Sequence, residues 1–141
     1  VGFDRPVNSD VAEFAILDKS AGDFSATYEA CDVFATNDAK RVKIVVDLTT
    51  QASVTDITCK LRTSNEAAAP AKGTAADWST RQWHGTAGNL VVTDYEPHKV
   101  VAAEGRFEFV FDVDARWCSP MVKVDVAASS RGVVYAYRSR K

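Results

Sequence analysis

Two histidines, His84 and His98, are the side chains best suited to acid–base chemistry near neutral pH. A nucleophilic mechanism needs a hydroxyl or thiol within hydrogen-bond reach of an imidazole, and a third group that orients the ring. Neither histidine has a cysteine close to it in the sequence, and no G-x-S-x-G motif occurs. Because His84 lies between Trp83 and Gly85, and His98 follows Pro97, we expect both to make structural hydrogen bonds or to face solvent.

Carboxylates are numerous, but most of them fall on the outward half of strand-like patterns. A glycosidase needs two carboxyls at a defined separation in a cleft, whereas Glu108 and Asp112 lie on one face of a predicted strand. The acidic run 112–117 lacks the glycine and the distal glutamate of a calcium loop. The segment 85–88, GTAG, matches neither phosphate-binding nor dinucleotide-binding loops. The sequence therefore predicts a non-enzymatic protein without catalytic, metal-binding or cofactor-binding residues.

The composition excludes several classes of protein. The chain has 141 residues, and its 17 basic and 19 acidic side chains give 17 − 19 = −2. This near-balance argues against a strongly basic nucleic-acid binder or a basic membrane-surface peptide. No apolar run approaches the roughly 18 residues of a membrane span. Hydrophobic residues make up 46% of the chain, which is typical of a soluble globular domain.

The three cysteines, Cys31, Cys59 and Cys118, are widely spaced and form no C-x-x-C motif. Cys31 and Cys59 fall inside strand-like patterns, where a cysteine behaves as a small buried hydrophobe. We expect three reduced core thiols, as suits a reducing cytoplasm. The alternative is one disulfide bridge with one free thiol.

Alternation with a period of two dominates the chain from residue 24 onward. It is cleanest in 105–113, where Phe107, Phe109 and Phe111 face one way and Arg106 and Glu108 the other. This pattern is typical of antiparallel strands with one wet face. About nine short strands, with no long amphipathic helix between them, predict an all-β, jelly-roll-like antiparallel sandwich. The stronger candidates lie in 24–36, 41–48, 55–64, 105–113, 120–128 and 131–140, and the weaker ones in 81–85, 89–95 and 98–101.

The domain organisation is an extended N-terminal arm, 1–13, followed by a single sandwich domain, 14–141. The stretch 11–22 could form one helical turn as readily as another structure. Within the sandwich, 64–80 is an irregular, alanine-rich loop interrupted by Pro70 and Gly73. A loop of this length in a compact domain is usually functional or mobile.

Three tryptophans leave several roles open. Trp117 is expected to cap the core, whereas Trp78 and Trp83 flank the long loop. Both could close one end of the sandwich, anchor a protein–protein contact, or form a sugar-binding platform together with Tyr95. The sugar platform would make the protein a carbohydrate-binding module, which is the alternative function.

The order of these motifs resembles the capsid decoration, or cement, proteins of tailed bacteriophages, which have a jelly-roll sandwich. The strand ending TCKLRTSNE leads into an excursion that ends in DWST, followed by GRFEFVFDV, SPMVKVDV and the terminal GVVYAY. The resemblance covers residues 40–138. It implies a virion protein, made in the host cytoplasm, that binds the outside of the capsid and bridges neighbouring major capsid proteins.

The resemblance also implies a homo-oligomer, dimeric or trimeric, with no membrane and no direct nucleic-acid contact. In this family the contacts come from termini, loops and sheet edges, which do not align as motifs. The resemblance therefore indicates contact regions of this chain, and no contact motif can be carried over. The contact regions are then the arm, 1–13, and the loop region 64–83, and the candidate interface residues are Phe3, Arg5, Val7, Trp78, Trp83 and His84.

Overall fold

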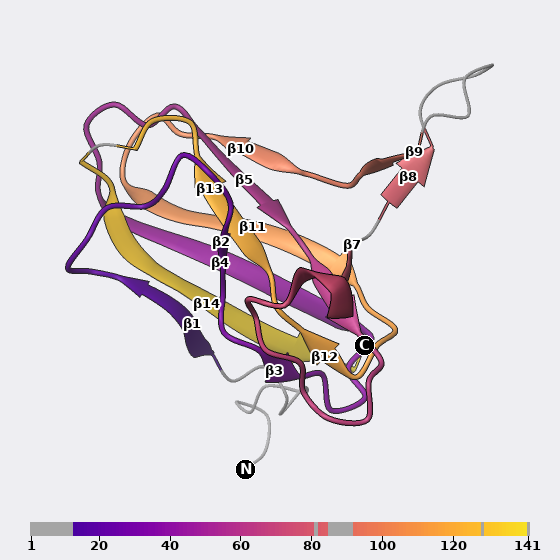
Figure 1. Cartoon of the computed structure of the whole chain (residues 1–141). Helices are drawn as coiled ribbons and strands as arrows, with labels where there is room; N and C mark the ends of the chain where they lie inside the picture. The colour runs from indigo at the N-terminus through magenta and orange to yellow at the C-terminus, as the bar shows by residue number, and fades with distance from the viewer. Residues whose placement is uncertain (1–12, 81, 85–91, 128, 141) are drawn as a thin grey trace, which may run out of the picture.

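The computed structural model describes residues 13–80, 82–84, 92–127 and 129–140 (Figure 1). Within them the protein is all-β, and its single helical element is a short 3-10 helix, η2 (Ala75–Asp77). The strands are β1 (Phe14–Lys19), β2 (Glu29–Ala30), β3 (Phe34–Ala35), β4 (Arg41–Thr50), β5 (Asp56–Lys60), β6 (Arg62–Ser64), β7 (Ser79–Thr80), β8 (Gln82–His84), β9 (Val92–Asp94), β10 (His98–Val100), β11 (Gly105–Asp112), β12 (Trp117–Cys118), β13 (Met121–Val124) and β14 (Arg131–Ser139).

Most of the strands pair as one long antiparallel hairpin rolled up on itself, and β6–β7 is a local pair outside this nesting. β1 pairs with β14, β2 with β13, β3 with β12, β4 with β11, β5 with β10, β6 with β7, and β8 with β9. Further antiparallel pairs, β14 with β4, β13 with β5 and β12 with β6, close the roll. The expected all-β, antiparallel sandwich is therefore confirmed.

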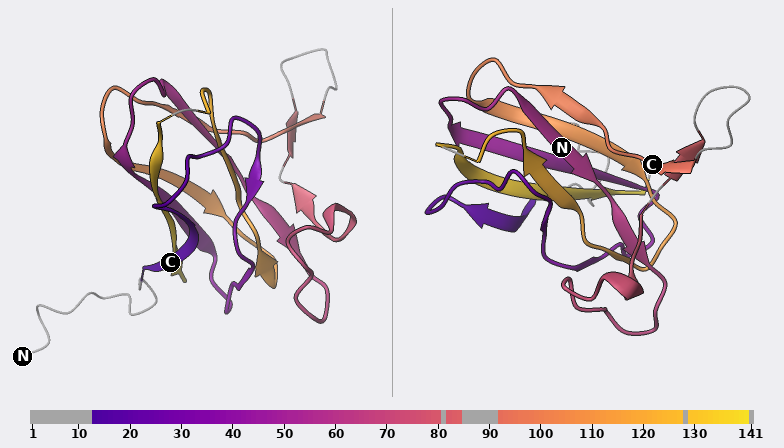
Figure 2. Two further views of the ribbon diagram at one scale, coloured as in Figure 1. Left: turned by 60° about the vertical axis from the view of Figure 1, so that its left-hand side comes forward. Right: turned by 45° about the horizontal axis from the view of Figure 1, so that its top comes forward.

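The rolled hairpin forms two packed layers (Figures 1 and 2). One layer is the sheet β1-β14-β4-β11, which we call the front sheet. The other consists of the sheets β10-β5-β13-β2 and β3-β12-β6-β7, which we call the back layer. These two sheets adjoin because only Leu61 separates β5 from β6, and only Ser119 and Pro120 separate β12 from β13. The ribbon β8–β9 belongs to neither layer and projects from the body (Figure 1).

The core lies between the layers, and the period-two pattern accounts for it. Alternate residues of each long strand point inward and are almost fully buried. They include Val42, Ile44, Val46 and Leu48 of β4, Ile57 and Cys59 of β5, Phe109 and Phe111 of β11, Val122 and Val124 of β13, and Val134 and Ala136 of β14. Burying this much apolar surface is the main favourable contribution to folding.

The stretch 11–22, for which a helical turn was one possibility, forms strand β1 from residue 14 onward. Phe14 and Ile16 contact the core, and a register shift between Ala15 and Leu17 disturbs the alternation. That irregularity explains why the period of two is weak here. All three weaker strand candidates, in 81–85, 89–95 and 98–101, contain strands (β8, β9 and β10).

Gly132 lies where β14 shifts its register against β4, between Arg131 and Gly132. A Cβ atom at this position would be 1.9 Å from the carbonyl oxygen of Asp47. Real Cβ atoms do not approach backbone oxygen so closely, so a side chain here would push β14 and β4 apart. At Gly73, by contrast, a Cβ atom would have no neighbour within 4 Å.

All three cysteines are free and fully buried. Burial raises the pKa of the Cys118 thiol to about 12 and also raises the pKa values of Cys31 and Cys59. The prediction of three reduced core thiols is therefore confirmed. Since the thiolate is the reactive form, all three side chains are protected from oxidation and alkylation. Reagents cannot reach them, and their raised pKa values keep them protonated.

We predict that Gly132→Ala lowers the free energy of unfolding by about 2 kcal/mol or more, as overpacking of a tight site does. Urea denaturation followed by circular dichroism would measure the change. Gly73→Ala is the matched control, because the same methyl group has free space there, and its effect should stay within about 0.5 kcal/mol. Equal effects of the two variants would contradict the assigned contact.

We also predict that no cysteine of the native protein reacts with Ellman's reagent on the timescale of minutes, whereas three thiols react after denaturation in urea. Mass spectrometry after alkylation would identify the modified positions. Rapid labelling of any of the three in the folded protein would show that the core is more open than the structure implies.

Candidate functional site

The predicted interface residues fall into three groups. Phe3, Arg5 and Val7 lie outside the described residues. Trp83 and His84 lie in β8, where they pair with Thr93 and Val92 of β9. Figure 2 shows the ribbon formed by these two strands extending away from the sandwich in both views.

Trp78, the remaining candidate, is only 9% exposed. Its Nε1–H donates a hydrogen bond to the carbonyl oxygen of Ala71 at 3.0 Å, and the guanidinium of Arg62 lies 5.2 Å from the ring centroid. The indole therefore packs within the fold, one of the roles left open for it, and offers little surface to a partner or a sugar. Trp78 holds the long loop together from within.

Arg62 is the residue around which the long loop is organised. Its Nε donates to the carbonyl oxygen of Ser119 at 3.0 Å, and its Nη2 donates to the Ser119 hydroxyl at 2.7 Å and to the carbonyl oxygen of Lys72 at 2.9 Å. In the alternation of 55–64, Arg62 falls on the outward side together with Lys60. It is nevertheless only 6% exposed, because Lys72 and Trp78 lie against it. Burial lowers the pKa of this guanidinium. Since a buried charge needs hydrogen-bond partners, Arg62 ties the loop to β6 and to Ser119.

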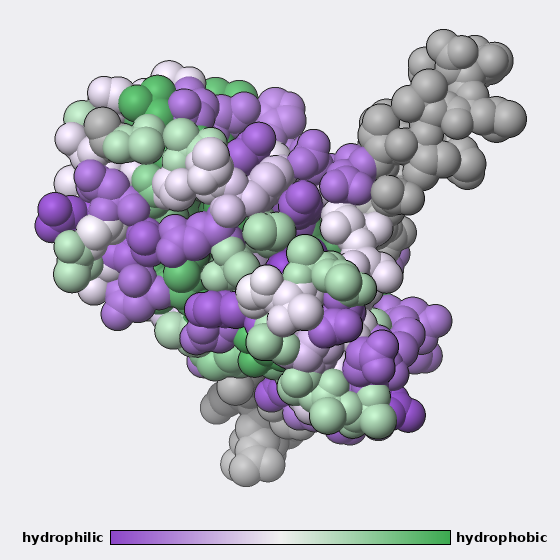
Figure 3. Space-filling view, in the orientation of Figure 1, coloured by the Kyte–Doolittle hydropathy of each residue, from purple (hydrophilic) through white to green (hydrophobic). Residues whose placement is uncertain are grey.

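The loop is exposed along 65–69 and 71–77, although Arg62 and Trp78 fix its path. Lys72 adds an ion pair with Asp32, with Nζ and Oδ1 3.0 Å apart. In Figure 3 its alanines form a pale green, mildly hydrophobic area at the lower right among more hydrophilic residues. The loop is thus exposed but held in place by these contacts, and we call it the pinned loop. A loop of this length is usually functional or mobile, and its fixed path favours the functional alternative.

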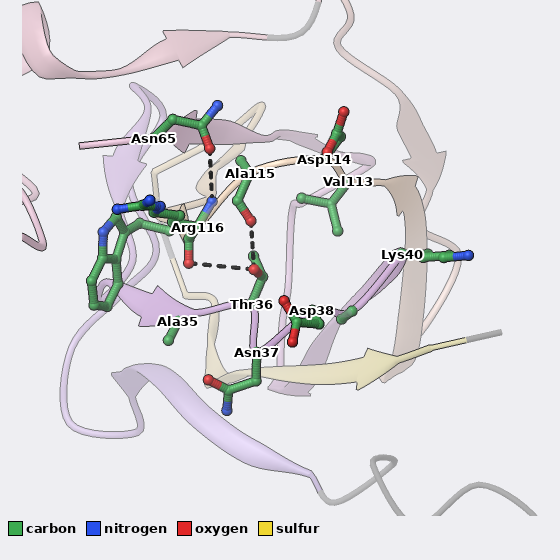
Figure 4. A pocket seen from close by; sticks show the side chains of 12 residues that line it. Ala35, Thr36, Asn37, Asp38, Lys40, Asn65, Val113, Asp114, Ala115 and Arg116 are labelled. Atoms are coloured by element: carbon green, nitrogen blue, oxygen red, sulfur yellow. Dashed lines mark hydrogen bonds between the residues drawn. The ribbon is translucent and has the colours of Figure 1, made fainter. Parts of the chain in front are cut away.

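A cleft of about 630 Å³ opens where the β3–β4 turn, the β11–β12 loop and Asn65 meet (Figure 4). Thr36 joins its walls: its backbone N–H donates to the carbonyl oxygen of Arg116 at 2.9 Å, and its hydroxyl donates to that of Ala115 at 2.5 Å. The backbone N–H of Arg116 donates to Oδ1 of Asn65 at 3.0 Å. No sequence pattern predicts this cleft, because its three segments meet only in the folded chain.

The β3–β4 turn adopts an uncommon backbone at two successive residues. Asn37 and Asp38 have φ values of 50° and 62°, and the N–H of Ala39 donates to the carbonyl oxygen of Thr36 at 3.0 Å. Both central residues of this turn are left-handed, as in the two-residue turns of β-hairpins, although β3 and β4 do not pair with each other. Asn and Asp tolerate this conformation better than most residues. The turn places the Asp38 carboxylate at the cleft, across from Asp114 and Asn65 (Figure 4).

Arg106 is the centre of a group of polar contacts on the outer face of the front sheet. Its guanidinium donates to Oε1 of Glu13 at 2.9 Å and to Oδ2 of Asp47 at 3.3 Å, and lies 5.3 Å from the centroid of the Tyr135 ring. The Tyr137 hydroxyl also donates to Glu13. Hydrogen bonds from Tyr137 and then from Arg106 lower the pKa of Glu13. Arg106 therefore reaches across the sheet and helps to fix the start of β1.

His98 lies at the edge of the back layer, with its Nδ1 3.0 Å from Oδ1 of Asp56 and its side chain 61% exposed. No hydroxyl or thiol of the described residues hydrogen-bonds to its ring. The expectation of a solvent-facing role is confirmed for His98, whereas the side chain of His84 lies outside the described part. Within that part, no group of three His, Cys, Asp or Glu side chains is arranged to hold a metal ion, and no helix is long and apolar enough to cross a bilayer.

No protein-family model, no curated protein and no solved structure shows significant similarity to the chain.

We predict that Arg62→Met lowers the free energy of unfolding by about 1–3 kcal/mol, because it leaves the buried oxygens of Ser119 and Lys72 without their donor. It should also expose 65–77 to trypsin or elastase under native conditions. Arg116→Met is the matched control, because Arg116 is exposed and its side chain has no partner among the described residues. If both variants resisted unfolding and proteolysis equally, Arg62 would not be the anchor of the loop.

Proposed function

We propose that the protein is a non-enzymatic structural protein of a tailed-bacteriophage particle. In this proposal it binds the outside of the capsid, as a dimer or trimer, and bridges neighbouring major capsid proteins. The proposal draws on the motif order of residues 40–138, on the jelly-roll-like sandwich and on the surfaces that the sandwich presents.

The observation that carries the proposal is the β8–β9 ribbon, which contains Trp83 and His84 and extends from the body (Figure 1). A two-stranded ribbon on its own is marginally stable in water. Packing against a second protein would stabilise it, and tryptophan is among the residues that contribute most to such contacts. A projecting ribbon on a rigid sandwich therefore suits a protein that reaches a neighbouring subunit.

The pinned loop supports the same proposal. Because Arg62, Trp78 and the Lys72–Asp32 pair already fix its path, binding through its exposed residues would cost little further conformational entropy. A protein that binds the assembled shell and not its separate subunits shifts the equilibrium toward the shell by mass action. Capsid stabilisation thus requires only a rigid body with accessible contact surfaces.

The alternative, a carbohydrate-binding module that uses exposed tryptophans, has lost part of its basis. Trp78 is buried, and the half-buried Trp117 donates its Nε1–H to the carbonyl oxygen of Glu66 at 3.0 Å. Tyr95 is 36% exposed, with its ring edge packed on Phe111 at a centroid distance of 6.0 Å. These rings do not gather into a platform.

We predict that the purified chain co-sediments with capsids of the phage that encodes it, after those capsids have been stripped of it. The double variant Trp83→Ala, His84→Ala should lose most of this binding while keeping its circular dichroism spectrum, as should a chain shortened by residues 1–12. Val100→Ala is the control, because it also removes an apolar side chain, 75% exposed on β10, without touching the ribbon. Absence of co-sedimentation by the unmodified chain would overturn the proposal.

A further inference from the structure

We propose that the cleft between the β3–β4 turn, the β11–β12 loop and Asn65 binds a short, uncharged oligosaccharide. This site is separate from the β8–β9 ribbon and from the tryptophan platform considered above. Its volume of about 630 Å³ lies within the roughly 300–1,000 Å³ of ordinary small-molecule sites.

The charges of the lining favour an uncharged ligand. Two carboxylates, Asp38 and Asp114, and two cations, Lys40 and Arg116, line the cleft. None of these four side chains forms an ion pair or a hydrogen bond within the described part of the chain. An anionic ligand would meet the two carboxylates, and the charged ends of Lys40 and Arg116 point away from the cleft (Figure 4), whereas the hydroxyl groups of an uncharged ligand can donate to the carboxylates.

The polar side chains are also of the kind that binds hydroxyl groups. Asn65 and Asp114 lie on one side of the cleft and Asp38 on the other (Figure 4). Carboxylates accept two hydrogen bonds, and an amide both donates and accepts, so each can engage neighbouring hydroxyls of one sugar ring. Because the Oδ1 atom of Asn65 is already bonded to the backbone of Arg116, its amide nitrogen remains to donate.

The apolar part of the lining is built mostly from small side chains. It consists of the alanines 35, 39 and 115, with Val113 and the half-buried Trp117. Such a surface suits the C–H faces of a sugar ring. It has no deep apolar pocket for a large side chain of a protein partner, which is how protein interfaces are usually anchored.

The walls of the cleft are fixed before any ligand arrives. Thr36 bonds to the opposite wall, the N–H of Val113 donates to the carbonyl oxygen of Lys40 at 2.9 Å, and Trp117 is tied to Glu66 through its indole nitrogen. A ligand would therefore meet an already ordered site, and little affinity would be lost to ordering it.

The experiment starts with an array of immobilised neutral, sialylated and sulfated oligosaccharides, and measures the strongest neutral binder by isothermal titration calorimetry. We expect binding to neutral glycans that falls about tenfold or more in Asp114→Ala and in Asp38→Gly, as loss of a hydrogen bond to a charged group does. Glycine at position 38 accepts the positive φ, so this variant should fold. Asp77→Ala, which removes an exposed carboxylate outside the cleft, should bind like the unmodified chain.

Several results would overturn the proposal: no binding to neutral glycans, binding to acidic glycans alone, or neutral binding that the Asp38 and Asp114 variants leave unchanged. Binding of a charged peptide library in place of glycans would assign the cleft to a protein partner and would also overturn it. Co-sedimentation of the same cleft variants with capsids should be unchanged, so that failure of the glycan proposal and failure of the capsid proposal can be told apart.

Discussion

The pairing of each early strand with a late one is the constraint on which the whole molecule depends. Phe14 is opposite Ala136, and Val42 is opposite both Phe111 and Arg138. Nearly every ladder therefore joins distant parts of the chain, and no half of the sequence can form a layer without the other. Chains dominated by such distant pairings fold slowly, because loop closure has to precede the contacts that reward it. Among the described strands, open edges remain at β1 and β11 of the front sheet, at the end strands of the two sheets of the back layer, and at β8 and β9 of the ribbon.

Two arginines add polar contacts to the stabilisation that the apolar core provides. Arg62 is buried under the long loop and bonds to Ser119 and Lys72, whereas Arg106 lies on the outer face of the front sheet and reaches Glu13 and Asp47. Each guanidinium joins segments that the backbone ladders leave apart. Their environments differ, however: the partners of Arg62 are neutral oxygens in a buried site, so removing it strands several acceptors. The ion pairs of Arg106 are exposed, and water screens them.

Three surface features of the protein are the basis of the two proposals. The projecting ribbon, the pinned loop and the polar cleft all rest on a rigid sandwich, and each could take its own partner without moving the core. A sandwich by itself selects no function. The proposals therefore depend on these particular features, with the ribbon carrying attachment to a particle and the cleft carrying recognition of a sugar.

The sequence by itself determined the class of fold, the main strands and the inward set of residues. This was possible because alternation such as Phe107, Phe109 and Phe111 reports locally which face of a strand is buried. It also indicated that the three cysteines are core residues. The tertiary structure decided the rest: that Arg62 and Trp78 are buried together, and that Thr36, Asn65 and Asp114 come to one cleft. These outcomes depend on loops folding back over strands and on segments far apart in the chain, and no local period encodes where such segments meet.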